Sequence, residues 1–381
     1  SATRSDIAIT DPDFKYPSLW KSNIAADYKF GDGWVATIEL LYSKDINAIY
    51  HDNIGLYRTE QFVNDGGAGN ARPYYNGYYS DREGNQKAAN HVVMLRNTSK
   101  GHSLYTTFQL QKNFVDGILK GLYLNGSYSF GQSRGVTDGT SSVATSAWKY
   151  RAALDGNAEE VGYTAGSFDG RLLLSASYTA NWSKYAATSF GLIYQRYRPF
   201  RYSYCYNGDA NGDSQFSNDL MYIPANFDEV KDHLLPGDFD SQEDAWKAMN
   251  AFIEQDPYLS KHRGEYAERN GAVAPFANQL DLSVSHDIKI YQKNGRSHTL
   301  RFSFNIANFL NLLNRNWGVV QTTVLGNQQY QFLTIPKGQG PSAANNYTLK
   351  YTMAKDLDET FKDNLNDVSR WQMQFGIKYI F

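Results

Sequence analysis

The last eleven residues, 371-WQMQFGIKYIF-381, place a large apolar side chain at every second position. These apolar side chains are Trp371, Met373, Phe375, Ile377, Tyr379 and Phe381. Polar residues or glycine stand between them, with Ile380 as the one exception. Because successive side chains of a β-strand point to opposite faces, the stretch predicts a strand with one apolar and one polar face.

The same alternation recurs in eight further segments of the chain. They are residues 19–30, 34–45, 102–111, 121–130, 171–182, 189–196, 278–290 and 299–308. With the last stretch they predict an all-β, antiparallel fold with nine visible strands. A soluble antiparallel sandwich shows the same alternation, so the pattern alone leaves two architectures open.

Aromatic residues at the strand ends favour a transmembrane β-barrel over the sandwich, because such residues form girdles at the two lipid interfaces. They are Trp20, Phe30, Trp34, Phe130, Trp182 and Phe381. The segment lengths also match the roughly 9 to 11 tilted residues that a strand needs to cross a bilayer. We therefore expect the apolar faces to contact the lipid bilayer of a Gram-negative outer membrane.

The connections between these segments alternate between short and long. The short ones are 31–33, 183–186 and 293–296, and the long ones are 46–101, 131–169, 206–275 and 308–368. Outer-membrane barrels have short periplasmic turns, long extracellular loops and an even number of strands. If the last strand runs toward the periplasm, counting back through nine alternating strands places residue 1 outside the cell. A complete barrel has both ends in the periplasm and would not begin there. We therefore expect residues 1–381 to be the C-terminal portion of a longer barrel.

The long connection 206–275 is predicted to be an extracellular insertion that contains a short helix. Ser241 followed by Asp244 is a capping signal for a helix within residues 240–256. An apolar stripe follows, made of Ala245, Trp246, Met249, Phe252 and Ile253. We expect this stripe to pack on the surrounding loops, with docking of a partner as the alternative.

Composition excludes several functions. The 37 basic and 39 acidic residues nearly balance, which gives no electrostatic footprint for nucleic acid. Cys205 is the only cysteine, so no disulfide framework or cysteine metal cluster is expected. The seven histidines are scattered, and neither H-E-x-x-H nor G-x-S-x-G occurs. We predict neither an enzyme nor an organic cofactor.

An acidic segment within 208–219 is a candidate calcium loop. Oxygen-bearing side chains stand at Asp209, Asn211, Asp213, Gln215 and Asp219. The spacing of the first four follows an EF-hand loop, in which Gln215 would contribute its carbonyl oxygen. Ser214 stands where that loop has glycine, and Leu220 stands where it has glutamate. The alternative is a turn-rich surface loop whose Asp and Asn side chains bond their own backbone.

A tyrosine-rich segment, 72-RPYYNGYY-79, supplies candidate substrate contacts. The candidates are Tyr74, Tyr75, Asn76, Tyr78 and Tyr79. Tyrosine and asparagine are typical of adaptable binding loops, where aromatic rings stack on sugars or line a peptide groove. Packing of the loops against one another is the alternative interpretation.

Several blocks together resemble the TonB-dependent outer-membrane receptors, in particular the Oar-like family of Bacteroidetes. Strand 299–308 ends in the Asn-apolar-apolar-Asn pattern at 308-NFLN-311, and 311-NLLN-314 with Trp317-Gly318 follows. The other blocks are residues 11–44, 208–224 and 259–285. The resemblance covers most of the chain, with gaps in the long loops.

The resemblance implies a plugged barrel of about 22 strands, of which these nine would be the last. It implies active transport of a nutrient, driven by the TonB complex through an N-terminal plug that this chain lacks. It also implies a surface lipoprotein lid as a partner in SusC-like relatives. The alternative function is a passive porin or a surface adhesin.

The last strand resembles the signal that the outer-membrane assembly machinery reads by edge pairing. The residues expected to carry that signal are Met373, Phe375, Ile377, Tyr379 and Phe381.

Overall fold

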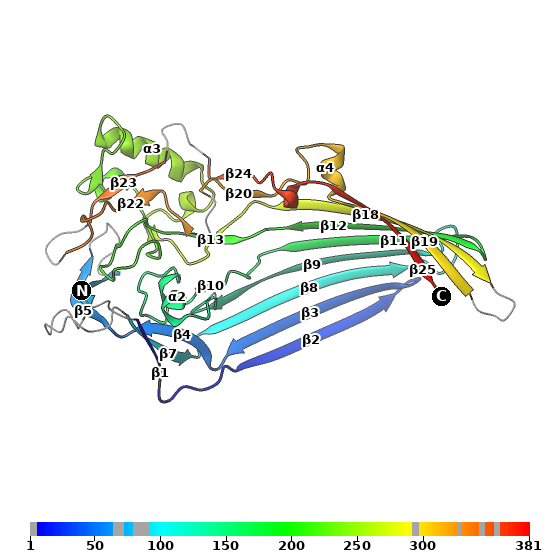
Figure 1. Ribbon diagram of the computed structural model, residues 1–381, viewed down its shortest axis with the longest axis horizontal. Helices are drawn as coiled ribbons and strands as arrows, with labels where there is room; N and C mark the ends of the chain where they lie inside the picture. Colours follow the sequence, from blue (N-terminus) through cyan, green and yellow to red (C-terminus); the bar gives the residue numbers. More distant parts are fainter. Residues whose placement is uncertain are drawn as a thin grey trace.

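The computed structural model describes residues 6–63, 72–78, 91–139, 141–291, 297–325, 329–342, 347–353 and 359–381. One large antiparallel sheet dominates it (Figure 1). Its nine long strands are β2 (Leu19–Phe30), β3 (Trp34–Asp45), β8 (Gly101–Asn113), β9 (Leu122–Gly135), β11 (Arg171–Ser183), β12 (Ala186–Tyr197), β18 (Ala277–Tyr291), β19 (Ser297–Ala307) and β25 (Gln372–Ile380). The short β10 (Gly162–Tyr163) adds to β9.

Each long strand pairs with the next long strand along the chain, so the sheet is a simple meander. All nine segments predicted from alternation are strands of this sheet, and the all-β, antiparallel prediction is confirmed. In the described part of the chain, β2 and β25 form the two edges and are not paired with each other. None of the described helices is long and apolar enough to span a membrane.

The register places apolar residues opposite one another across neighbouring strands. Ile38 of β3 faces Ala26 on one side and Phe108 of β8 on the other, and Phe108 in turn faces Tyr128 of β9. Polar side chains share the opposite face, where the Thr107 and Ser129 hydroxyl oxygens lie 2.9 Å apart. The period of two is therefore continuous across the strands as well as along them.

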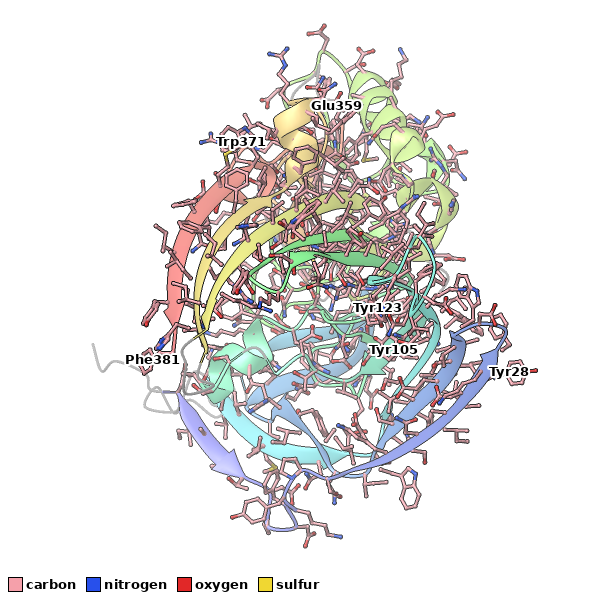
Figure 2. All side chains as sticks on the ribbon, turned by 90° about the vertical axis from the view of Figure 1, so that its right-hand side faces the viewer. Tyr28, Tyr105, Tyr123, Glu359, Trp371 and Phe381 are labelled. Carbon is pink, nitrogen blue, oxygen red and sulfur yellow. The ribbon has the colours of Figure 1, made fainter. Side chains whose placement is uncertain are left out.

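The sheet is curved, and its two faces are chemically distinct (Figure 2). Tyr28 and Phe381 point away from the space that the curved sheet partly encloses, whereas Tyr105 and Tyr123 point toward it (Figure 2). The apolar rows thus belong to the outer face and the polar rows to the inner face.

Short turns gather at one end of the sheet and long connections at the other (Figure 1). The turn between β2 and β3 uses Gly31 and Gly33, whose φ angles of 53° and 82° are in the left-handed region that favours glycine. The C-terminus lies at the short-turn end (Figure 1). The alternation of short and long connections read from the sequence is therefore present in the fold.

The long connections contain small sheets that the sequence did not predict. These are β1 (Ile7–Thr10), β4 (Ala48–Asn53) and β7 (Val92–Thr98); β5 (Leu56–Val63) and β6 (Arg72–Tyr78); β13 (Arg201–Tyr204), β17 (Ala272–Val273) and β21 (Gln329–Tyr330); β14 (Tyr222–Ile223) and β16 (Glu265–Tyr266); β15 (Leu234–Leu235), β22 (Leu333–Thr334) and β23 (Leu349–Tyr351); and β20 (Gln321–Thr323) and β24 (Phe361–Asp363). Most are too short to show a period of two.

In the described part of the connections there are three α-helices and several 3-10 turns. The helices are α2 (Ala144–Lys149), α3 (Gln242–Gln255) and α4 (Phe309–Leu313). Helix α3 confirms the prediction for 240–256, and the hydroxyl of its N-cap Ser241 accepts a hydrogen bond from the Asp244 amide at 3.1 Å.

A hydrophobic core holds the long connections together, and α3 supplies one side of it. Four of the five predicted stripe residues are buried, and Trp246 packs at the edge of the core with its ring 5.9 Å from that of Phe227. Tyr204 and Phe332 are fully buried opposite the helix. The Tyr204 hydroxyl donates to the buried Asp256 carboxylate at 2.6 Å. The stripe therefore packs on the loops, as expected.

The Asn-apolar-apolar-Asn pattern closes the loop end of β19. Asn308 adopts a left-handed conformation with a φ of 52°. Its side-chain amide donates to the Gly318 and Ser369 carbonyls at 2.9 and 3.0 Å. The side-chain amide of Asn311 donates to the Trp317 carbonyl at 3.1 Å. The asparagines thus fix the turn that connects the sheet to the last long connection.

Replacing Phe252 in α3 by alanine is expected to loosen the loop core without unfolding the large sheet. Its ring lies 5.0 Å from that of Phe332, so truncation leaves a cavity that costs about 3–5 kcal/mol. Native-state proteolysis should then cleave within 206–275 far faster than in the unsubstituted protein. Glu254→Ala, at an exposed position of the same helix, is the control. Equal protease resistance of both variants would show that α3 does not hold the core.

Candidate functional site

The acidic segment lies in the loop between β13 and β14, and it is mostly buried. Asn211 and Asp213 are fully inaccessible to solvent and Asp219 is nearly so. The alternative of a turn-rich surface loop is therefore wrong about the location, because the loop packs beneath β6 and the chain that follows α2. It is correct about the hydrogen bonds, because Asp and Asn side chains of the loop accept from its own backbone amides.

Asp209 organises the backbone of the loop. Its Oδ1 accepts hydrogen bonds from the Asn211 and Gly212 amides at 3.1 and 2.6 Å, and its Oδ2 accepts one from the Ser214 amide at 2.8 Å. Asn211 then accepts from the Asp213 amide at 2.9 Å. These side-chain oxygens are occupied by the loop's own N–H groups.

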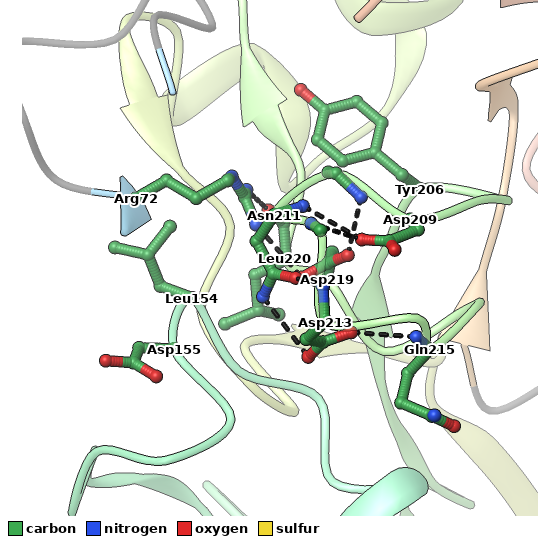
Figure 3. Close-up of polar contacts among 12 residues, drawn as sticks. Arg72, Leu154, Asp155, Tyr206, Asp209, Asn211, Asp213, Gln215, Asp219 and Leu220 are labelled. Atoms are coloured by element: carbon green, nitrogen blue, oxygen red, sulfur yellow. Dashed lines mark hydrogen bonds and ion pairs between the residues drawn. The ribbon is translucent and has the colours of Figure 1, made fainter. Parts of the chain in front are cut away.

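Asp219 is neutralised by an arginine that the sequence analysis did not single out. Arg72 Nη1 lies 3.3 Å from Asp219 Oδ1, and both side chains are buried. The other oxygen of Asp219 accepts from the Ala210 amide at 2.8 Å. Arg72 also donates to the Leu220 carbonyl (Figure 3). The ion pair joins residues far apart in the chain, so no local pattern could have indicated it.

Asp213 is a fully buried carboxylate, and no cationic side chain lies within ion-pair distance of it among the described residues. Its oxygens accept from the Gln215 amide at 2.8 Å and from the Asn211 side-chain amide at 3.3 Å. Burial raises the pKa of Asp213 well above its usual range, and repulsion from Asp219 and Asp209 adds to the increase. The site therefore favours either a protonated Asp213 or a bound cation.

The donors only partly fit a calcium loop. Ser214 has a φ of 65°, the left-handed conformation for which the EF-hand loop uses glycine. However, the Gln215 side chain points away from the three aspartates (Figure 3). Asp209 and Asp219 already bind backbone amides and Arg72, and the described residues contain no group of three or more His, Cys, Asp or Glu side chains arranged to hold a metal. Calcium binding by this loop stays a prediction.

The tyrosine-rich segment forms β6 and packs directly on the acidic loop. The Tyr75 amide donates to the Asn211 carbonyl at 2.7 Å, and its hydroxyl donates to Asp155 at 2.7 Å. Tyr74, Tyr75 and Tyr78 are buried, whereas Asn76 is exposed. Tyr79 lies outside the described residues. Contact of a substrate with the three buried rings would require this packing to open.

The structure thus joins two segments that the sequence analysis treated separately. The strand β6 supplies Arg72 to Asp219 and Tyr75 to Asn211, so the acidic loop and the tyrosine-rich segment form one buried polar unit. Arg72 was part of the quoted tyrosine-rich segment, but nothing local marked it as an ion-pair partner.

The predicted assembly signal lies on β25, at one edge of the large sheet. Residues 372–380 pair with β19 in antiparallel register. Four apolar side chains on the outer face, Met373, Phe375, Ile377 and Tyr379, are exposed, and the terminal Phe381 is 92% exposed. An exposed edge strand with alternating apolar residues is suited to recognition by edge pairing.

Comparisons with protein-family models, with curated proteins and with solved structures find no match for this chain.

Replacing Asp213 by asparagine is expected to stabilise the protein at neutral pH when calcium is chelated. The pKa of Asp213 is higher in the folded than in the unfolded chain, so stability falls as the pH rises from about 3.8 toward the folded pKa. Asparagine keeps an acceptor for the Gln215 amide and removes the charge, which should gain roughly 1–3 kcal/mol. Thermal denaturation across this pH range measures both effects.

Asp209→Asn is the matched control and should destabilise, because both of its oxygens accept backbone amides. Millimolar calcium should raise the Tm of the unsubstituted protein and leave Asp213→Asn unchanged if the loop binds this ion. If Asp213→Asn is less stable than the unsubstituted protein when calcium is chelated, Asp213 is not an unneutralised buried charge. If calcium still raises the Tm of Asp213→Asn, this loop is not the calcium site.

Proposed function

We propose that this chain forms part of the wall of an outer-membrane β-barrel that takes up a nutrient by TonB-dependent active transport. The observation that carries the proposal is the exposed apolar outer face of the large sheet. Ile24, Phe375 and Ile377 on that face are 70%, 66% and 63% exposed.

The energetics of this face favour a hydrocarbon environment. Each fully exposed large aliphatic or aromatic side chain forgoes roughly 1.5–3 kcal/mol of burial free energy in water. Soluble monomers rarely expose contiguous apolar patches larger than a few hundred Å². A sandwich would cover this face with a second sheet, whereas here Ile24, Phe108 and Phe375 on different strands stay exposed. Lipid chains would cover the same surface.

The inner face is suited to a water-filled lumen. The Arg301 guanidinium donates to both oxygens of Asp287 at 2.6 and 2.8 Å, and the Gln195 amide donates to Gln279 at 3.1 Å. Polar ladders of this kind line the interior of outer-membrane barrels. The two faces together support a membrane-spanning wall with a polar interior.

The packed long connections favour a binding receptor over a passive pore. They share a hydrophobic core built on α3, with Asp256 hydrogen-bonded at its centre. A fixed assembly of this kind can present a defined ligand site, which a diffusion pore does not need. The resemblance of residues 11–44, 208–224 and 259–285 to Oar-like receptors supports the same choice.

A paired substitution in β8 tests the membrane-facing assignment. Phe108 lies on the outer face and Gln109 on the inner face near mid-strand. Arginine on the lipid face near the bilayer midplane costs about 2–4 kcal/mol, while a lumen position tolerates it. Phe108→Arg should therefore reduce folding into lipid vesicles strongly, and Gln109→Arg should not. The reverse order of effects would indicate a water-facing outer surface.

Electrical recording of the full-length protein in planar bilayers distinguishes receptor from porin. A receptor whose lumen is plugged should show no steady conductance, because the plug blocks ion flow. Deleting the plug that the proposal implies should then open a channel. Steady conductance of the full-length protein would favour the passive porin instead.

A further inference from the structure

A polar cavity of about 510 Å³ lies among the long connections, beside the acidic loop. Its lining includes Asp138, Arg151, Ser203, Arg269, Asn270 and Gln331. This volume is within the range of roughly 300–1,000 Å³ that is typical of small-molecule sites. None of the sequence motifs pointed to it, because its residues come from three separate connections, those between β9 and β11, between β12 and β18, and between β19 and β25.

Two buried arginines meet at this cavity. Arg151 and Arg269 are only 6% and 3% exposed, and both donate to the same backbone oxygen, that of Val136. Arg151 also donates to the Ala158 carbonyl at 3.0 Å, and Arg269 donates to the Gly135 carbonyl. Two positive charges are therefore held close together by neutral acceptors.

The other buried arginines of the described chain have carboxylate partners. Arg72 pairs with Asp219 at 3.3 Å, and Arg201 pairs with Asp169 at 2.9 Å. In the same part of the chain, no carboxylate lies within ion-pair distance of Arg151 or Arg269. Buried guanidinium groups usually require a paired charge, so the two at the cavity are the exceptions.

The electrostatic environment agrees with this difference. Burial and, next, the neighbouring charge of Arg269 lower the pKa of Arg151 to about 10, although Glu160 opposes both effects. Burial also lowers the pKa of Arg269, against an opposing effect of Asp138. Glu160 accepts hydrogen bonds from the Leu154 and Asp155 amides at 2.8 and 3.4 Å, and in the described chain it forms no ion pair with either arginine. The surrounding carboxylates therefore compensate the two arginines only in part.

We infer that this cavity binds a small organic ligand through a carboxylate group, which Arg151 and Arg269 neutralise. Planar guanidinium groups match the geometry of a carboxylate and bind it more strongly than neutral donors do. Ser203, Asn270 and Gln331 make the cavity wall polar, and Ser203 and Asn270 are held there by hydrogen bonds to each other and from Asn270 to Asp138. The role of this ligand as transported cargo rests on the proposed function, whereas its binding does not.

Carbonyl hydrogen bonds alone do not account for the arrangement. They satisfy N–H donors, but they leave the net charge of the two guanidinium groups in place. An anion in the cavity would supply the missing charge in a region where screening by water is weak.

The test uses the intact protein in detergent micelles and measures Tm and binding heat. The probes are acetate, which is small enough for any carboxylate site, and the pair galacturonate and galactose, which differ at C6. Chloride at matched ionic strength is the reference salt. We expect both carboxylates to bind and to raise the Tm, and galactose to have no effect.

Two variants are expected to change the affinity for carboxylate in opposite directions. Arg151→Gln removes the charge and leaves one amide group where the arginine bonds three carbonyls, and it should weaken carboxylate binding at least tenfold. Asp138→Asn removes a negative charge from the cavity wall and should strengthen binding several-fold. If Arg151→Gln does not fold, Asp138→Asn still decides the sign.

The assignment is overturned if neither carboxylate raises the Tm more than chloride does, if galactose binds as well as galacturonate, or if the variants respond like the unsubstituted protein. Binding in micelles without uptake by cells would leave the cavity assignment intact and count against the transport proposal. Uptake without carboxylate binding would do the reverse.

Discussion

The antiparallel register of the nine long strands is the constraint on which the other features depend. A shift of one residue between any two strands would move apolar side chains to the polar face. The meander avoids this because Ile38, Phe108 and Tyr128 stay opposite one another on successive strands. The continuous outer apolar face, the inner polar ladders and the two unequal ends of the sheet all follow from this register. In the described part of the chain, β2 and β25 are the edges of this sheet, each with one paired neighbour.

The long connections are organised by different physics. Most strands within them are too short and too irregular in pattern to form one large sheet. The connections therefore pack through aromatic rings around buried polar side chains. Asp256 accepts hydrogen bonds from the Tyr204 and Thr360 hydroxyl groups, and Asp219 forms an ion pair with Arg72. Each buried acid joins connections that are remote in sequence. This explains how a part of the molecule with strands of two or three residues maintains a defined core.

The sequence predicted what depends on local periodicity. The nine strands, helix α3 and the Asx-type bonds of Asp209 all arise from residues close together in the chain, and the structure contains all of them. The small sheets and the Arg72–Asp219 pair were not predictable in this way, because they depend on contacts between distant segments. The burial of Tyr74, Tyr75 and Tyr78 belongs to the same class. Composition made these rings candidates for substrate contact, but composition does not show which loop covers which.

The arrangement of the buried charges is the feature that a purely structural role explains least well. Among the described residues, the buried Asp213 has no cation within ion-pair distance, and the buried Arg151 and Arg269 have no acid within that distance. The segment 151–158 lies between them, since Arg151 donates to the Gly156 carbonyl and a Cβ placed on Gly156 would lie 3.6 Å from Asp213 Oδ2. A fold selected for stability alone would bring such charges together or replace them with apolar residues. Keeping them apart leaves each able to interact with a charged ligand, which is the behaviour expected of a binding region rather than of a structural core.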